Sequence, residues 1–135
     1  MTRVVVPVRY RLSRHSERTL RRAVRVAEER GAKLTVLHVD LYQNGRKVTR
    51  TDLKRAVEDS VGELDGTRYA VRQGFAVEET ILEEVAAEEA DVVVIGHKQV
   101  GRWRRMISSL TSDPDIESYL RDRLDCEVIT VDAAG

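Results

Sequence analysis

Two groups of basic side chains are the residues of this sequence best suited to hold a ligand. The first group follows an apolar run at residues 4–8 and consists of Arg9, Arg11, Arg14 and His15. The second follows a similar run at residues 91–96 and consists of His97, Lys98, Arg102, Arg104 and Arg105. Guanidinium and ammonium groups form strong charge-assisted hydrogen bonds with phosphate and other oxyanions. The groups predict an anion-binding site if the fold brings them together; otherwise they are solvated, or pair with Asp113, Asp115 and Glu117.

The familiar catalytic and cofactor patterns are missing. A dinucleotide fingerprint requires glycines directly after the first strand, and none is present there. Gly96 and Gly101 have the spacing of a P-loop, but Arg102 and Trp103 follow them, so the hydroxyl that would bind magnesium is lacking. The single cysteine, Cys126, excludes a disulfide framework and a zinc-ligand pattern, and we expect it to be buried as a small apolar residue. We therefore predict no catalytic residue and no metal site.

Two other residues allow both a structural and a functional interpretation. His38 falls inside an apolar run, so it is expected to be a packed or hydrogen-bonded core group rather than a catalyst. Trp103 lies within the second basic group, where its ring could stack on a base. The favoured interpretation is that Trp103 anchors a loop by packing, or contributes to a dimer contact.

Composition excludes several classes of partner. The 135 residues fit a single domain, 1–135, and carry 23 basic and 23 acidic side chains, whereas a nucleic-acid-binding domain usually has a basic excess. Only 4% of the residues are aromatic, which also disfavours a base-stacking surface. No apolar run approaches the roughly 20 residues of a membrane span. Because the first predicted strand begins at residue 3, no signal peptide is expected and a cytoplasmic location is predicted.

The periodicity of apolar residues predicts the elements that must position these side chains. Strands are predicted at residues 3–8, 33–40, 67–73, 91–96 and 127–132. Helices are predicted at residues 16–29, 51–64, 77–90 and 113–124, with residues 97–112 irregular. Ser16 is the expected N-cap and Gly31 the expected end of the first helix. The inward face of the third helix is predicted to consist of Ile81, Leu82, Val85 and Ala86.

Strands that alternate with helices indicate an α/β fold, an open five-stranded parallel sheet with helices on both faces. Ligands of such sheets bind beyond the carboxyl ends of the strands, where the strand order reverses. Both basic groups directly follow strands, so both belong to this edge of the predicted sheet.

The order and spacing of several segments resemble the universal stress protein family. These are the first strand with its VVVPV sequence, Ser16-Glu17 at the start of the following helix, residues 29–40, residues 71–74, residues 79–96 and the closing strand at residues 126–131. The resemblance implies a sheet of order 3-2-1-4-5, the adenine nucleotide alpha hydrolase-like fold. It also implies a non-catalytic stress-response or signalling role, and a homodimer that often forms by antiparallel pairing of the fifth strands.

The ATP-binding branch of that family has an Asp after the first strand and a G-x2-G-x9-G-[ST] motif after the fourth. In this sequence Arg9 occupies the Asp position, and Gln99 replaces the second glycine. Counting back from Cys126 places Pro114 and Asp115 where the final Gly-Ser would be, which leaves a carboxylate at that helix start. We therefore predict weak ATP binding, with AMP or phosphate as weak alternatives and no cofactor required. A modified phosphate loop that still holds an adenine nucleotide is the alternative.

The predicted anion site combines strand ends with the two basic groups. Its candidate residues are Pro7, Val8, Arg9, Arg11, Val39, Ile95, Gly96, Lys98, Gly101 and Arg102. The predicted dimer strand would present an apolar edge formed by Val128, Ile129 and Val131. A second alternative is a partner-docking module that uses the basic residues 97–105 and the acidic segment 78–91.

Overall fold

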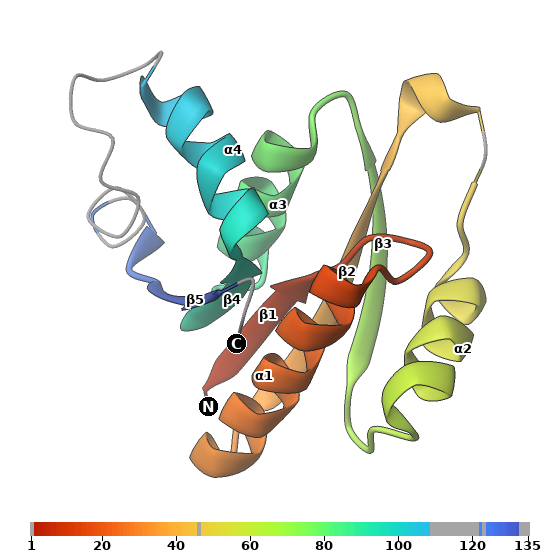
Figure 1. The fold of residues 1–135 in the computed structure, drawn as a ribbon. Coiled ribbons are helices and arrows are strands. Elements are labelled where there is room, and N and C mark those ends of the chain that lie inside the picture. Colours follow the sequence, from red (N-terminus) through yellow and green to blue (C-terminus); the bar gives the residue numbers. More distant parts are fainter. Residues whose placement is uncertain (1, 46, 109–121, 123, 133–135) are drawn as a thin grey trace.

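The computed structural model describes residues 2–45, 47–108, 122 and 124–132, and its centre is a five-stranded parallel sheet (Figure 1). The strands are β1 (Arg3–Pro7), β2 (Lys33–Leu41), β3 (Arg68–Gly74), β4 (Val92–Gly96) and β5 (Glu127–Val131). Their order is β3-β2-β1-β4-β5, and every neighbouring pair is parallel. The predicted fold class and strand order are thus confirmed. The order reverses at β1, which lies between β2 and β4.

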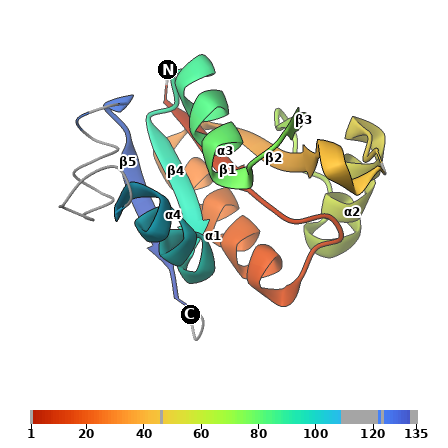
Figure 2. The same ribbon diagram turned by 90° about the horizontal axis from the view of Figure 1, so that it is seen from above.

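Helices cover both faces of the sheet (Figures 1 and 2). The helices are α1 (Arg14–Arg30), α2 (Arg50–Val61), α3 (Val77–Ala87) and α4 (His97–Ser108), with a short 3₁₀ turn, η1 (Tyr42–Asn44), after β2. Successive side chains of a strand point to opposite faces. Accordingly, Val4 and Val6 pack with residues of α1 and α2, whereas Val5 packs with residues of α3 and α4.

Helix α1 begins earlier than the sequence indicated. Ser13, not Ser16, is its N-cap, and the Ser13 hydroxyl accepts a hydrogen bond from the backbone N–H of Ser16. Ser16 is buried one turn further on, and its Oγ accepts the backbone N–H of Arg9 at 3.0 Å. The prediction of Ser16 as the cap was wrong because this contact with the preceding loop uses its hydroxyl. Gly31 ends the helix in the left-handed conformation, as predicted.

The largest difference from prediction is α4, a regular helix where an irregular segment was expected. Val100, Trp103 and Met106 are spaced by three residues and pack together against the core on the α3 side of the sheet. This apolar face explains the helix. The predicted helix at 113–124, including Asp113 and Asp115, lies outside the described residues except for Asp122 and Leu124.

Helix α3 also differs in its details. It ends at Ala87 rather than at residue 90, and Glu89 follows with a positive φ of 52°. Ile81 and Val85 are buried as predicted, but Ala86 is exposed. The side chain of Glu84 is buried in its place, because strand β3 offers it a cationic partner.

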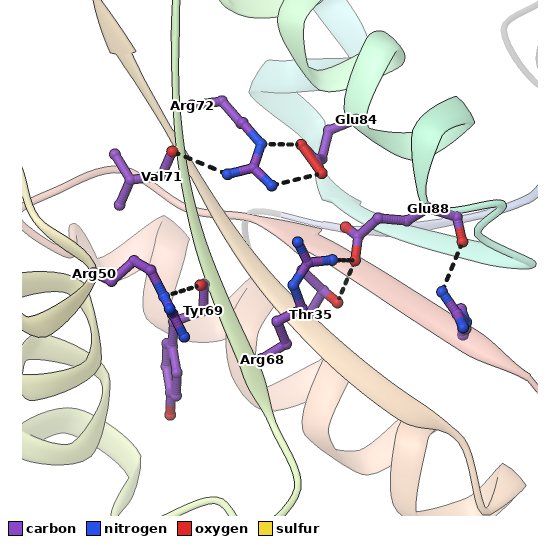
Figure 3. A network of polar contacts seen from close by, with 9 residues as sticks. Thr35, Arg50, Arg68, Tyr69, Val71, Arg72, Glu84 and Glu88 are labelled. Atoms are coloured by element: carbon purple, nitrogen blue, oxygen red, sulfur yellow. Dashed lines mark hydrogen bonds and ion pairs between the residues drawn. The ribbon is translucent and has the colours of Figure 1, made fainter.

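Two ion pairs attach α3 and its C-cap residue, Glu88, to β3 (Figure 3). Arg72 forms a bidentate pair with Glu84, with Nε–Oε2 at 2.5 Å and Nη2–Oε1 at 3.2 Å. Arg68 pairs with Glu88, whose Oε1 also accepts the hydroxyl of Thr35 at 2.9 Å. Both carboxylates are only 6% exposed. Part of the acidic segment proposed for docking is therefore turned toward the sheet.

Candidate functional site

A cavity of about 770 Å³ opens at the carboxyl ends of β1, β2 and β4, where the strand order reverses. Eight of the ten predicted site residues line it: Pro7, Val8, Arg9, Arg11, Val39, Gly96, Lys98 and Arg102. The other two, Ile95 and Gly101, do not. Ile95 is fully buried in the core beside α3 and α4, and Gly101 belongs to the first turns of α4.

Four cationic side chains from two segments converge on this cavity. Arg9 and Arg11 lie in the loop after β1, and Lys98 and Arg102 are one turn apart on α4. Within the described part of the chain, none of these four side chains makes an ion pair or a hydrogen bond. The predicted convergence of the two basic groups is thus present, while their predicted pairing with Asp113, Asp115 and Glu117 concerns residues outside this description.

The other basic residues of the two groups do not line the cavity, with one exception. His15, in the first turn of α1, lines it, and its ring centroid is 5.6 Å from that of His97 in the first turn of α4. The pKa of His15 is lowered from its ordinary value of 6.5, chiefly by the charge of Lys98 and then by burial, His97 and Arg18. This lowering favours the uncharged form of the His15 imidazole. Each of these two histidines lies in the first turn of a helix that follows one of two adjacent strands, β1 and β4.

The side chains that line the cavity at the end of β2 are buried, and one of them is acidic. His38 and Asp40 alternate along β2, line the cavity, and are 8% and 6% exposed. His38 Nδ1 is 3.1 Å from the carbonyl oxygen of Val8, which confirms a packed and hydrogen-bonded histidine. Burial lowers its pKa, opposed by the Val8 carbonyl and the charge of Asp40. Asp40 Oδ2 accepts the backbone N–H of Val48 at 2.9 Å.

Sequence reasoning missed Asp40 as a lining residue. Its alternation with His38 near the end of a predicted strand was the available signal, because both side chains must then lie on the same face of the sheet. That signal was weak, since the loop that covers Asp40 contributes Val48 from eight residues further along the chain.

Two residues of α4 complete the description. Gln99, at the position of the family's second glycine, lines the cavity, and its Nε2 has no hydrogen-bond partner among the described residues. Trp103 is fully buried and does not line the cavity, so the packed interpretation is confirmed, on a helix rather than a loop. The described residues contain no group of three His, Cys, Asp or Glu side chains arranged for a metal ion. None of the described helices has the length and apolar character needed to cross a membrane.

A parallel sheet with helices on both faces and a cavity at the reversal of strand order defines a nucleotide-binding-like α/β domain. The family model described as "Universal stress protein family" matches residues 1–131, and this chain belongs to that family. Comparison with curated protein sequences finds no significant match.

Three solved structures show the same fold at low sequence identity. A universal stress protein in complex with cAMP has a TM-score of 0.60 and 18% identity over 96% of both chains. UspA from Lactobacillus plantarum has a TM-score of 0.57 and 19% identity, over 96% of this chain and 97% of that one. A universal stress protein from Archaeoglobus fulgidus in complex with dAMP has a TM-score of 0.56 and 18% identity over the same shares.

Proposed function

We propose that this chain is a non-catalytic ligand-binding domain with a stress-response or signalling role, and that its cavity takes an anionic metabolite of the nucleoside phosphate class. The observation that carries the proposal is the convergence of four unpaired cationic side chains, among the described residues, on one cavity at the switch point. Like charges held close together repel one another, and a bound oxyanion reduces that repulsion by forming charge-assisted hydrogen bonds. Relatives of the same fold bind cAMP and dAMP, which supports a nucleotide-sized ligand.

We further propose that ATP binds weakly. Helix α4 begins directly after β4, so the backbone N–H groups beyond its first turn, which a glycine loop would wrap around a triphosphate, are used in helical hydrogen bonds here. Arg9 stands at the strand end where the ATP-binding members have a carboxylate. The expected dissociation constant for ATP is roughly 0.1 mM or weaker, a binding free energy of about −5.5 kcal/mol. A micromolar constant measured by calorimetry would contradict this.

A phosphate series measured by thermal unfolding tests the anion site. Ligand that binds only the native state raises the melting temperature, so inorganic phosphate should stabilise the wild-type chain at fixed ionic strength. Arg9→Ala and Arg102→Ala should each weaken phosphate binding about tenfold, since a hydrogen bond to a charged group contributes about 1.5–3 kcal/mol. Arg104→Ala is the matched control, because Arg104 is exposed on the same helix and does not line the cavity. A melting temperature that does not change with phosphate would disprove the site.

We also propose a homodimer joined at least partly through β5. This strand has a neighbour, β4, on one side only among the described residues, and Val128, Ile129 and Val131 are half-buried. Exposed strand edges of this kind pair readily. Ile129→Lys should shift the chain toward monomer in light scattering while circular dichroism verifies the fold, and Ile129→Val should leave the dimer intact. A wild-type monomer at micromolar concentration would rule out this assembly.

A further inference from the structure

The two large apolar side chains that are exposed among the described residues are in contact with each other. Phe75 is 79% exposed and Tyr42 is 52% exposed, and their ring centroids are 4.7 Å apart. Single exposed apolar residues are common on protein surfaces, but two in contact form a patch, and an apolar patch marks a candidate site for a partner. Neither residue lines the cavity, so the proposed anion site does not account for them.

The register of β2 and β3 brings the two rings together. Leu41 at the end of β2 pairs with Gly74 at the end of β3. Tyr42 and Phe75 follow these residues directly, at the same edge of the sheet (Figure 1). The Gln43 side chain donates from Nε2 to the carbonyl oxygen of Phe75 at 3.2 Å, which connects the two loops. The rings are therefore positioned before a partner binds, and this reduces the ordering cost of binding.

The helix that follows the rings is acidic. Helix α3 starts two residues after Phe75 and contains no basic residue. Glu79 and Glu83 are exposed and one turn apart, so both carboxylates lie on the same side of this helix. Neither makes an ion pair with another described residue. Aromatic faces and carboxylates both attract cations, so the rings and the acids favour the same kind of partner.

We propose that Tyr42, Phe75, Glu79 and Glu83 form a docking surface for an arginine-bearing segment of a partner protein. A guanidinium can stack flat on an aromatic ring and donate hydrogen bonds to a carboxylate from its edge. The ammonium of lysine is a compact and strongly hydrated charge that stacks less well. A surface of this small size gives weak and transient contacts. The docking surface lies outside the cavity and requires no ligand there.

Labelled homopeptides of arginine and of lysine, equal in length, test the docking surface by fluorescence anisotropy at low ionic strength. The wild-type chain should bind the arginine peptide about threefold more tightly, because the guanidinium stacks on the rings. Phe75→Leu, which keeps an apolar side chain but removes the ring, should abolish this preference, and Phe75→Tyr should retain it. Glu79→Gln combined with Glu83→Gln should weaken both peptides about fivefold and leave the preference unchanged.

Two controls limit the effect to this surface. Glu63→Gln combined with Asp65→Asn removes two exposed acids before β3, at the opposite edge of the sheet, and should change either affinity less than about twofold. Arg102→Ala weakens the proposed anion site and should not change peptide binding, so each proposal can fail without the other. Circular dichroism verifies that each variant is folded.

The outcomes decide the proposal as follows. No binding of either peptide, equal binding of both by the wild type, or an equal loss in the variant of Glu63 and Asp65 would overturn it. Dissociation of a wild-type assembly by Phe75→Leu in light scattering would show that a second copy of the chain covers the rings, which would also overturn it. An arginine preference that Phe75→Leu removes and the loss of Glu79 and Glu83 leaves unchanged supports the docking surface.

Discussion

Removing Arg72 from its ion pair with Glu84 should lower the free energy of unfolding much more than removing Glu84. The Glu84 side chain is 6% exposed, whereas that of Arg72 is 40% exposed. Arg72→Met strands a buried carboxylate that has no other side-chain partner among the described residues, so we expect a loss of about 3 kcal/mol in the free energy of unfolding. Glu84→Met leaves a guanidinium that remains partly hydrated and still donates to the Val71 carbonyl, so the expected loss is about 1 kcal/mol.

The double variant completes the cycle. With both charges replaced by apolar side chains, stability should return to within about 1 kcal/mol of the wild type, because no buried charge is left uncompensated. Urea unfolding followed by circular dichroism gives the four free energies, and the melting temperature should change by about 4 °C per kcal/mol. Arg30→Met is the control: its pair with Glu127 is exposed on both sides, so it should cost less than about 1 kcal/mol. Equal losses for the two single variants, or additive losses in the double variant, would refute this reasoning.

Three further predictions follow from single sites. Gly74→Ala should lose about 1–3 kcal/mol, since an added Cβ would collide with the Thr80 side chain, and Thr80→Ala in the same chain should recover part of that loss in urea titration. Cys126 should remain unmodified by a thiol reagent at about pH 8 until the chain unfolds, because burial raises its pKa to about 11. The lowered pKa of His15 means that the unfolded chain binds more protons just below pH 6.5, so stability should fall as the pH drops through that range, and His15→Gln should reduce the fall measured by thermal unfolding.

Strand patterns predicted the fold well because β1 and β4 are short runs of apolar residues bounded by polar ones. The run at residues 91–96 has the length and nearly continuous apolar character of a buried strand, and the structure places Val92–Gly96 between β1 and β5. The residues at which helices begin and end were harder to predict. Ser13 and Ser16 are both good N-caps by residue type, and only the contact between Ser16 and the Arg9 backbone, formed in the folded chain, decides between them.

Site residues could be predicted from the sequence where they are charged and directly follow a predicted strand. They could not be predicted where their burial depends on contacts with an element elsewhere in the chain. Arg9 and Lys98 could be named because each follows an apolar run. Asp40 could not, because its burial depends on the loop that carries Val48. The burial of Glu84 could likewise not be predicted, because its cationic partner lies twelve residues earlier, on β3.

The helical form of residues 97–108 connects the fold to the site. One side of α4, with Val100, Trp103 and Met106, packs into the core, and Trp103 is fully buried there. Lys98 and Arg102 are one turn apart, so a single helix orientation carries both to the cavity. A glycine loop binds phosphate through backbone N–H groups that adapt to the ligand, whereas this arrangement presents side-chain charges from a helix held by its own apolar face. Affinity here should therefore depend on salt and on individual side chains more than in a loop built of glycine.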